Sequence, residues 1–397
     1  MRVLIVTSLY PRPGYETNAT FHRRLFTALA KNHEVTILAP LPWTLMIRPP
    51  RDTGGRGVRL PRWSRDEDGI WVARPRSYFT PKVLTRHYGA MFRWSIGPTF
   101  RRLVDQVRPD VVLGSWAHPD GWAAVKLAHR AGLPAVMMVI GSDILVATRN
   151  PARRRRIVEG LREADRVLAV SRDLANHVED LGVNAEKVDV LHTGVDPVVF
   201  HPGDRDESRR RLGLDAMSKR VLYVGNLYLS KGVGVLLDAL RLLKSRGVAF
   251  ACDLVGGGGD EPRLLAQASA AGLGDVVTFR GRRPHDELAD WYRSCDVLAL
   301  PSDSEGIPNV LREATACGRP WVATRVGGIP EIADPAVDRL VPPRDPEAIA
   351  DAIASTLADP PSTLDSPTRV PCPTWDESAR RLADRLALAI ADHEGRS

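Results

Sequence analysis

The sequence predicts an α/β protein built from two doubly wound domains, each a parallel sheet covered by helices. Short apolar runs alternate with helical patterns through residues 1–191, which is typical of βαβ units. Residues 196–218 interrupt this alternation with prolines, a glycine and a charged run that fits a helix, and the alternation restarts at residue 220. With 397 residues, the chain is long enough for two domains with separate cores.

The first domain is expected to span residues 1–195. Residues 41–75, rich in Pro, Arg and Gly, are interpreted as a long loop with one strand near 70–73. The other strands are predicted at 2–7, 34–39, 110–114, 135–140, 166–170 and 188–191, and the helices at 18–32, 121–131, 151–163 and 171–181.

The second domain is expected to span residues 196–374, followed by a last helix over 375–391. Its strands are predicted at 220–224, 249–255, 276–280, 297–300, 321–323 and 339–341, and its helices at 233–244 and 346–358. In open parallel sheets, ligands bind beyond the carboxyl ends of the strands. We therefore expect functional residues in the loops that follow the strands.

Positive charge is concentrated near the beginning of the chain. Residues 1–110 carry 19 Lys and Arg against 8 Asp and Glu, a formal charge of +11, whereas the whole chain carries +7. Such a region favours an anionic surface or substrate, although solvated arginines are the simpler alternative. No nucleic-acid recognition motif accompanies the charge, so we expect no nucleic-acid partner.

The sequence favours a cytoplasmic location, either free or at the inner face of the cytoplasmic membrane. No apolar run reaches the roughly 18–20 residues that span a bilayer, and residues 1–6 fit a first strand better than a signal peptide. The four cysteines have no metal-type spacing and are expected to be reduced thiols: Cys252, Cys295, Cys317 and Cys372.

The stretch from 302 to 318 is the most informative part of the sequence. A buried strand leads into a polar turn and a helix, with Pro308 predicted as the first helical residue and Gly318 as the stop. Ile307 would then hold the cap position, although Ile cannot accept a hydrogen bond.

The start of that helix is predicted to bind an anion, because unpaired N–H groups and the positive dipole end attract phosphate. Glu305 and Glu313 flank it, and carboxylates suit the hydroxyls of a sugar. The alternative is a helix capped by Ser304 or water, with two solvated glutamates. The donors would be the backbone N–H groups of Asn309, Val310 and Leu311.

Two other turns follow strands of the second domain. Lysine is scarce, with 7 residues against 48 Arg, and Lys231 before Gly232 could reach a phosphate as a point charge. An ordinary surface lysine is the alternative. The glycine run 256–259 allows backbone to approach a ligand closely or forms a flexible loop. It does not match the phosphate-binding GxxxxGK[ST] pattern.

In the first domain, His118 follows a strand and precedes a helix, which places it at the edge of the expected ligand site unless it is structural. Residues 78–100 interleave aromatic side chains with Lys82, Arg86 and Arg93. This mixture suits a membrane interface, and aromatic residues at helical spacing suit a packed core equally well.

Taken together, these stretches resemble the retaining GT-B glycosyltransferases of family four over nearly the whole chain. The most specific motif is the pair Glu305 and Glu313, similar to the Glu-x7-Glu signature of that family. The segments 324–331, 281–288, 256–259, 225–232, 194–196 and 141–143 are also similar. The resemblance implies two Rossmann-like domains facing across a cleft, with the helix that begins at Trp375 packing back onto the first domain.

The resemblance also implies a role for each matching residue. Glu313 would hold the donor ribose, Glu305 the donor sugar near its reacting carbon, and Lys231 the diphosphate. His118 would contact the donor sugar, so that Glu305, His118 and Lys231 are the predicted catalytic residues. The other predicted donor-binding residues are Gly225, Asn226, Gly306, Ile307, Pro308, Asn309, Val310, Gly281 and Arg282, and Gly14 would lie in a loop beside acceptor and diphosphate.

The sequence departs from the family pattern in places. Asn226 stands where members often have Arg, so one positive charge on the diphosphate is missing unless Arg12, Arg23 or Arg325 replaces it. The first loop has only Gly14 where members often have paired glycines. Ile140 and Thr193 also replace frequent family residues.

These features predict transfer of a hexose-type sugar from a nucleoside diphosphate sugar to an acceptor, with retention of configuration. Neither a metal nor another cofactor is expected, because Lys231 and the helix start would supply the positive field. The predicted acceptor is lipid-linked or a cell-envelope glycan, near an anionic membrane surface. The alternatives are a nucleotide-sugar epimerase of the same architecture and a non-catalytic partner that binds a nucleotide sugar.

Overall fold

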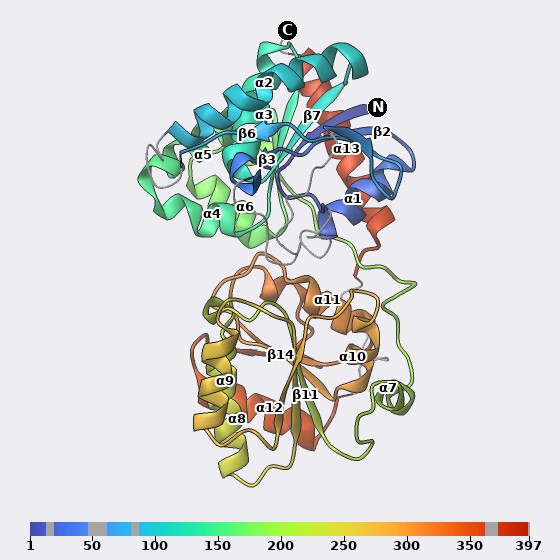
Figure 1. Ribbon diagram of the computed structural model, residues 1–397, viewed down its shortest axis with the longest axis vertical. Coiled ribbons are helices and arrows are strands. Elements are labelled where there is room, and N and C mark those ends of the chain that lie inside the picture. Colours follow the sequence, from blue (N-terminus) through green and yellow to red (C-terminus); the bar gives the residue numbers. More distant parts are fainter. Residues whose placement is uncertain (13–19, 47–61, 81–86, 362–371, 396–397) are drawn as a thin grey trace. The chain divides into compact units, whose positions relative to one another are not determined.

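The computed structural model describes residues 1–12, 20–46, 62–80, 87–361 and 372–395, and the chain forms two compact units (Figure 1). Unit 1 comprises Met1–Gly194 and Trp375–Ser397, and unit 2 comprises Val195–Thr374. Each unit has its own cluster of buried apolar side chains. The chain first passes from unit 1 to unit 2 between residues 194 and 195, one residue before the predicted boundary.

Unit 1 contains an eight-stranded sheet in the order β10-β9-β8-β7-β1-β2-β5-β4. All pairings in this sheet are parallel except that of β4 with β5. The strand predicted near 70–73 is confirmed as β5, whereas the short antiparallel edge strand β4 lies in the segment that was predicted as loop. The strands are β1 (Arg2–Val6), β2 (Glu34–Leu38), β4 (Trp63–Arg65), β5 (Trp71–Ala73), β7 (Val111–Ser115), β8 (Ala135–Val139), β9 (Arg166–Ala169) and β10 (Val188–Val190). A separate ladder pairs β3 (Leu41–Pro42) with β6 (Arg76–Ser77).

Helices cover both faces of this sheet (Figure 1). Local signals start several of them: Asn150 and Ser171 accept backbone hydrogen bonds at the starts of α5 and α6. The helices are α1 (Thr20–Ala30), α2 (Tyr88–Val107), α3 (Trp122–Arg130), α4 (Ser142–Leu145), α5 (Pro151–Glu163), α6 (Arg172–Asp180) and α13 (Trp375–Glu394).

The last helix of the chain, α13, completes unit 1. It packs against α1, β7 and β8 and buries Leu382, Leu386 and Ala389 in their core. In Figure 1 it is the red helix among the blue and green elements. An ion pair of 2.7 Å between Lys31 and Asp376 joins its first turn to the residue after α1.

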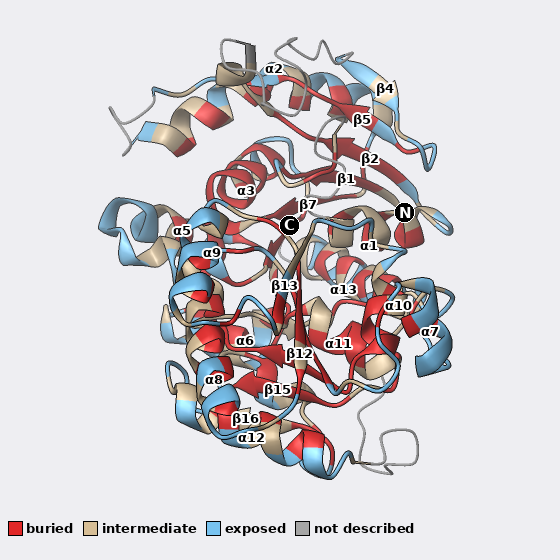
Figure 2. Ribbon diagram, turned by 60° about the horizontal axis from the view of Figure 1, so that its bottom comes forward, coloured by how far each residue is buried: buried red, intermediate tan, exposed pale blue. Residues whose placement is uncertain are grey.

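Unit 2 contains a six-stranded parallel sheet in the order β13-β12-β11-β14-β15-β16. Its central strands are buried along their length (Figure 2), which explains their continuous apolar runs. The strands are β11 (Arg220–Val224), β12 (Ala251–Val255), β13 (Val277–Gly281), β14 (Val297–Leu300), β15 (Trp321–Thr324) and β16 (Arg339–Val341). The helices are α7 (Arg205–Arg211), α8 (Val233–Ser245), α9 (Glu261–Ala270), α10 (Leu288–Ser294), α11 (Asn309–Ala316) and α12 (Pro346–Ala358).

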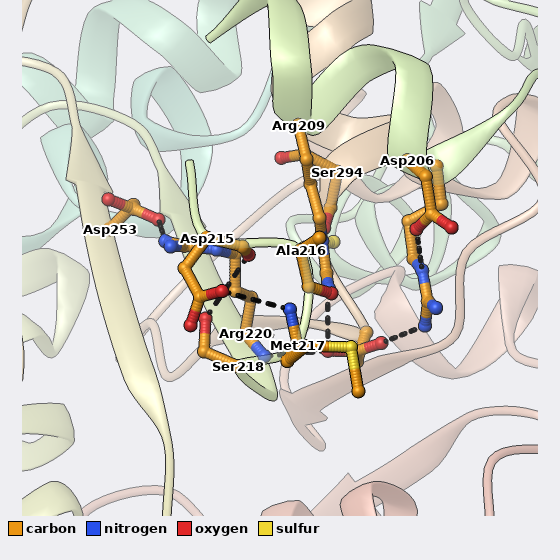
Figure 3. A network of polar contacts seen from close by, with 12 residues as sticks. Asp206, Arg209, Asp215, Ala216, Met217, Ser218, Arg220, Asp253 and Ser294 are labelled. Atoms are coloured by element: carbon orange, nitrogen blue, oxygen red, sulfur yellow. Dashed lines mark hydrogen bonds and ion pairs between the residues drawn. The ribbon is translucent and has the colours of Figure 1, made fainter. Parts of the chain in front are cut away.

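A network of ion pairs closes the amino-terminal edge of this sheet (Figure 3). The carboxylate of Asp296, just before β14, accepts hydrogen bonds from the Arg209 guanidinium at 2.9 Å and from the Arg220 backbone N–H at 2.6 Å. The Arg220 guanidinium in turn donates to Asp253 at 2.7 Å. Because these buried charges are paired, they hold α7 against the sheet. The loops that follow the strands lie at the opposite edge.

Both main sheets share one topological feature. The strand order reverses beside the first strand of each unit, between β1 and β7 in unit 1 and between β11 and β14 in unit 2. Loops diverge at such a switch point, and ligands of doubly wound proteins bind there, beyond the carboxyl ends of the strands.

None of the described helices is both long enough and apolar enough to cross a bilayer. The four cysteines, all of which the structure describes, carry free thiols.

Candidate active site

Lys231 and Glu305 meet at the switch point of unit 2. Lys231 lies in the loop after β11, and Glu305 in the loop after β14. The Lys231 ammonium donates to Glu305 Oε1 at 2.7 Å, and the Ser302 hydroxyl donates to the same oxygen at 2.7 Å. The side chains remain 32% and 11% exposed, so a ligand can reach the pair. The sequence singled out both residues but not their contact, nor the role of Ser302.

Glycines let neighbouring loops press against the Glu305 loop. Gly232 has φ of +69°, and a Cβ there would lie 1.8 Å from the Pro301 carbonyl oxygen. Gly327 has φ of +54°, and a Cβ there would lie 1.9 Å from the Glu305 carbonyl oxygen. No side chain fits at either position, and the loops after β11 and β15 thereby hold Glu305 in place.

The glycine run after β12 packs on the loop after β11. A Cβ at Gly256 would lie 1.8 Å from the Gly225 carbonyl oxygen, and one at Gly258 would lie 2.3 Å from that of Leu227. Next to them, the Arg282 guanidinium donates to the Gly257 carbonyl oxygen at 3.0 Å. The run is therefore used for close backbone packing.

Of the predicted donor-binding residues, Gly225, Asn226, Gly281 and Arg282 all follow or end strands at this same edge of the sheet. The backbone of Asn226 is held by the Tyr223 hydroxyl, which donates to its carbonyl oxygen at 2.8 Å.

Helix α11 begins one residue later than predicted. Pro308 is extended, with φ of −75° and ψ of 123°, and occupies the cap position, while Asn309 is the first helical residue. The proline ring has no group that accepts a hydrogen bond. The expectation that the Leu311 N–H lacks a partner was wrong, since it donates to the Pro308 carbonyl oxygen at 3.3 Å. Gly306 and Ile307 precede this start, and Val310 lies in its first turn.

Glu313 is buried and held by two side chains of unit 2. The Tyr292 hydroxyl donates to Glu313 Oε2 at 2.7 Å, and His285 Nε2 lies 3.0 Å from Oε1. The ring of Phe200 packs edge-on against both partners. The alternative of a solvated glutamate is therefore wrong for Glu313. His285 lies in the segment 281–288, which is similar to the family, whereas no pattern in the sequence pointed to Tyr292.

A second polar cluster lies at the switch point of unit 1. Ser8, after β1, donates its backbone N–H and its hydroxyl to the Asp120 carboxylate at 2.5 and 3.0 Å. Burial raises the Asp120 pKa to about 7. Beside this pair, the buried His22 lies 2.6 Å from the Ser115 hydroxyl. Sequence reasoning missed these residues, because each is a common residue type without a motif around it.

His118 follows β7 at the same edge and is 8% exposed. Its imidazole packs against Tyr88 and Trp122, and a Cβ at Gly89 would lie 2.6 Å from its Nε2. Burial, helped by nearby arginines, lowers the His118 pKa to about 4. The imidazole is therefore neutral near pH 7, and a contact with substrate would be a hydrogen bond between neutral groups. Its catalytic role stays a prediction.

The remaining predicted residues are less informative. Gly14 lies outside the described residues. Arg23 pairs with Asp68 at 2.6 Å and with Glu67 at 2.9 Å, so its charge is already compensated. Arg325 is exposed just after β15, at the edge of the sheet where Lys231 lies.

Helix α2 confirms the packed-core interpretation for part of the aromatic stretch. Phe92 and Phe100 are buried in the core of unit 1, with Ile96 and Leu103 on the same face. On the outer face, Trp94 is 76% exposed. Arg101 and Arg102 are exposed on the same helix.

The whole chain resembles proteins of known structure. It superposes on sucrose-phosphate synthase from Thermosynechococcus elongatus with a TM-score of 0.75 and 22% identity, covering 99% of this chain and 97% of that one. It superposes on HepE from Anabaena in complex with UDP with a TM-score of 0.70 and 19% identity, covering 100% and 98%. These likenesses, with two doubly wound units, confirm the expected class, the GT-B glycosyltransferase fold.

Family patterns match both units. The pattern described as Glycosyl transferases group 1 matches residues 204–369, and that of Glycosyltransferase Family 4 matches residues 19–199. The chain therefore belongs to the family 4 glycosyltransferases, as its motifs predicted.

Curated relatives are similar over part of their length. The chain is 34% identical to a D-inositol 3-phosphate glycosyltransferase of Mycolicibacterium vanbaalenii over 295 residues, covering 71% of this chain and 65% of that protein. It is 35% identical to a protein of the same name from Frankia alni over 260 residues, covering 61% and 64%. The chain thus spans slightly less than two thirds of these relatives.

Proposed function

We propose that this protein transfers a hexose-type sugar from a nucleoside diphosphate sugar to an acceptor, with retention of the anomeric configuration. The observation that carries the proposal is the contact between Lys231 and Glu305 at the switch point of unit 2. It combines a cation for the leaving diphosphate with a carboxylate for the sugar, at the point where doubly wound sheets bind nucleotides.

The chemical task is to stabilise a diphosphate that leaves an electron-poor sugar carbon. The Lys231 ammonium and the positive end of α11 would receive the charge that develops on the diphosphate. This assignment needs no metal ion, and we propose none for the transfer step. Arg12 and Arg325 remain the candidates for the positive charge that Asn226 does not supply, since Arg23 is paired with two carboxylates.

Glu313 is suited to hold a ribose. Its two oxygens are oriented by Tyr292 and His285, and a carboxylate so fixed accepts hydrogen bonds from two neighbouring hydroxyls. HepE, which shares the fold, was solved with UDP and with UDP-glucose. That likeness supports a nucleotide-sugar donor for this chain, without selecting the base.

Retention is proposed through same-face displacement assisted by the leaving phosphate. Glu305 is engaged by both Lys231 and Ser302, which suits a positioning role better than that of a free nucleophile. In this mechanism, a diphosphate oxygen takes the proton of the acceptor hydroxyl as the C–O bond to the acceptor forms. The bond between the sugar and the diphosphate breaks on the same face.

The donor is tested by binding and turnover together. Thermal unfolding with UDP, GDP and ADP sugars should identify one nucleotide that raises the Tm, because a ligand that binds only the folded state stabilises it. Incubation with that donor should then give transfer or slow hydrolysis with release of nucleoside diphosphate. An epimerised donor without such release would support the epimerase, and binding without either reaction would support the non-catalytic partner.

For the acceptor, we propose a lipid-linked or membrane-proximal glycan. The +11 charge of residues 1–110 and the exposed Trp94 on α2 support it, since basic and aromatic side chains suit the headgroup region. The names of the curated relatives favour a second candidate, a small anionic acceptor such as an inositol phosphate. The same positive charge would attract either.

Liposome sedimentation separates the two acceptors. Anionic vesicles at low salt should bind the protein, and Trp94→Ala with Arg101→Glu should weaken that binding. Trp63→Ala is the matched control, because Trp63 is also exposed in unit 1 but lies on β4. Failure to bind vesicles, together with transfer to inositol phosphate in solution, would reject the membrane-proximal acceptor.

A further inference from the structure

Three side chains that are common metal ligands meet on unit 1, outside the candidate active site. His129 lies in the last turn of α3, Asp165 lies just before β9, and His393 lies in the last turn of α13. One ligand atom from each lies within 4.8 Å of the others. Because the three residues lie far apart in the sequence, they do not form a metal-type spacing.

Each histidine lies about as far from one oxygen of the Asp165 carboxylate as neighbouring ligands of a tetrahedral ion lie from each other. His129 Nε2 lies 3.1 Å from Asp165 Oδ2, and His393 Nδ1 lies 3.4 Å from Asp165 Oδ1. Ligand atoms about 2.0–2.1 Å from a tetrahedral Zn²⁺ lie roughly 3.3 Å from one another. The two imidazole rings are stacked with their centroids 6.0 Å apart, so both face the carboxylate from neighbouring positions.

Asp165 is already oriented for such a role. Its side chain is 3% exposed, and Oδ2 accepts a hydrogen bond of 2.8 Å from the Ala135 N–H at the start of β8. A charged carboxylate fixed by backbone is typical of metal sites. The imidazoles of His129 and His393 are 32% and 25% exposed, which gives an ion access and leaves room for a water ligand.

We propose that His129, Asp165 and His393 form a structural Zn²⁺ site that fastens the end of α13 to unit 1. The site lies at the amino-terminal edge of β8 and β9, whereas His118 and Asp120 follow the carboxyl end of β7. It is therefore separate from the sugar-transfer chemistry. An ion pair of 2.9 Å between Arg166 and Asp392 lies beside it and joins the same two elements.

The test uses the full-length protein after treatment with a chelator. Isothermal titration with Zn²⁺ near neutral pH should show one site per chain. The Tm should rise by roughly 3–5 °C for each tenfold excess over the dissociation constant. His129→Ala and His393→Ala should each weaken Zn²⁺ binding at least about tenfold. His201→Ala is the control, because that exposed histidine lies in unit 2 and should leave binding unchanged. Mg²⁺, which prefers oxygen ligands, should give no shift.

The fastening of α13 has its own readout. Trypsin cleavage at Arg380, Arg381 or Arg385 requires α13 to leave its position, so Zn²⁺ should slow release of the terminal fragment by mass spectrometry. This protection should vanish in His393→Ala. The proposal is overturned if Zn²⁺ gives no binding heat, if both histidine variants bind as tightly as the parent, or if binding leaves cleavage of α13 unchanged.

Discussion

The Lys231 ammonium lies 2.7 Å from Glu305 Oε1, so two residues predicted to hold different parts of the donor hold each other. In an ion pair this close, each group compensates the other's charge. A diphosphate that binds at Lys231 must therefore compete with Glu305 for the ammonium. Glu305, once released, gains the freedom to accept hydrogen bonds from the sugar, which couples the two halves of donor recognition.

Lys231→Ala is expected to lower kcat about 10²–10³-fold, because it removes a preorganised positive group at the leaving diphosphate. Lys244→Ala is the control, since Lys244 lies at the end of α8 and pairs with Asp275. Steady-state kinetics with the identified donor measure both. A loss of similar size in Lys244→Ala would mean that general charge, not position, matters.

The coupling between Lys231 and Glu305 is expected to make their variants non-additive. Glu305→Gln removes one charge of the pair, and the double variant with Lys231→Ala should lose less activity than the product of the single losses. A double-mutant cycle in kcat/KM measures this directly. Strictly multiplicative losses would show that the two side chains act independently.

Tyr292→Phe is expected to raise the donor KM about tenfold with a smaller effect on kcat, because hydrogen bonds to charged groups contribute about 1.5–3 kcal/mol. Without the Tyr292 hydroxyl, Glu313 keeps only His285 of the two described partners. Tyr78→Phe is the control, since Tyr78 is 45% exposed in unit 1. An unchanged KM would argue that the orientation of Glu313 does not matter for donor binding.

Gly232→Ala is expected to lower stability by more than the roughly 1–2 kcal/mol that left-handed backbone alone costs an L-residue. A Cβ there meets the Pro301 carbonyl oxygen at 1.8 Å, so the loop must also move. Gly247→Ala isolates the backbone term, because Gly247 has φ of +75° with nothing within 4 Å of its Cβ position. In thermal unfolding, Gly232→Ala should lower the Tm more than Gly247→Ala does. Only Gly232→Ala should also weaken donor binding.

The buried carboxyl of Asp120 predicts a specific pH dependence of stability. Its pKa is raised from 3.8 to about 7 in the folded protein, so the folded state binds the proton more tightly than the unfolded state. The stability from this group is present below the unfolded pKa and is lost as the pH rises through about 7. The free energies of unfolding of the parent and of Asp120→Asn, measured with urea, should therefore differ more at higher pH. A difference independent of pH would contradict this assignment.

Sequence reasoning succeeded where chain-local patterns decide structure. The strands of unit 2 are continuous apolar runs, and most begin or end within two residues of their predicted limits. The same holds for α5, whose Asn150 cap and Pro151 start mark its beginning. The class and family followed from Glu305, Glu313 and the glycine motifs, because these combine spacing with residue type.

It failed where the decisive contact joins distant segments. Tyr292 precedes Glu313 by 21 residues and reaches it only because α10 and α11 pack together. Ser8 and Asp120 meet through the pairing of β1 with β7, which no local pattern encodes. The strand β4 was missed because three residues at a sheet edge, with Trp63 exposed, do not produce a periodic signal.

The place of α13 has a consequence for how the protein is made. Unit 2 is inserted in the sequence between the two segments of unit 1. On the ribosome, every residue of unit 2 therefore emerges before Leu382, Leu386 and Ala389, which close the core against α1, β7 and β8. Until α13 is synthesised, the apolar surface of unit 1 that α13 covers stays exposed. Unit 2 by then already has all its residues. Unit 2 is thus completely synthesised before unit 1, although unit 1 begins the chain.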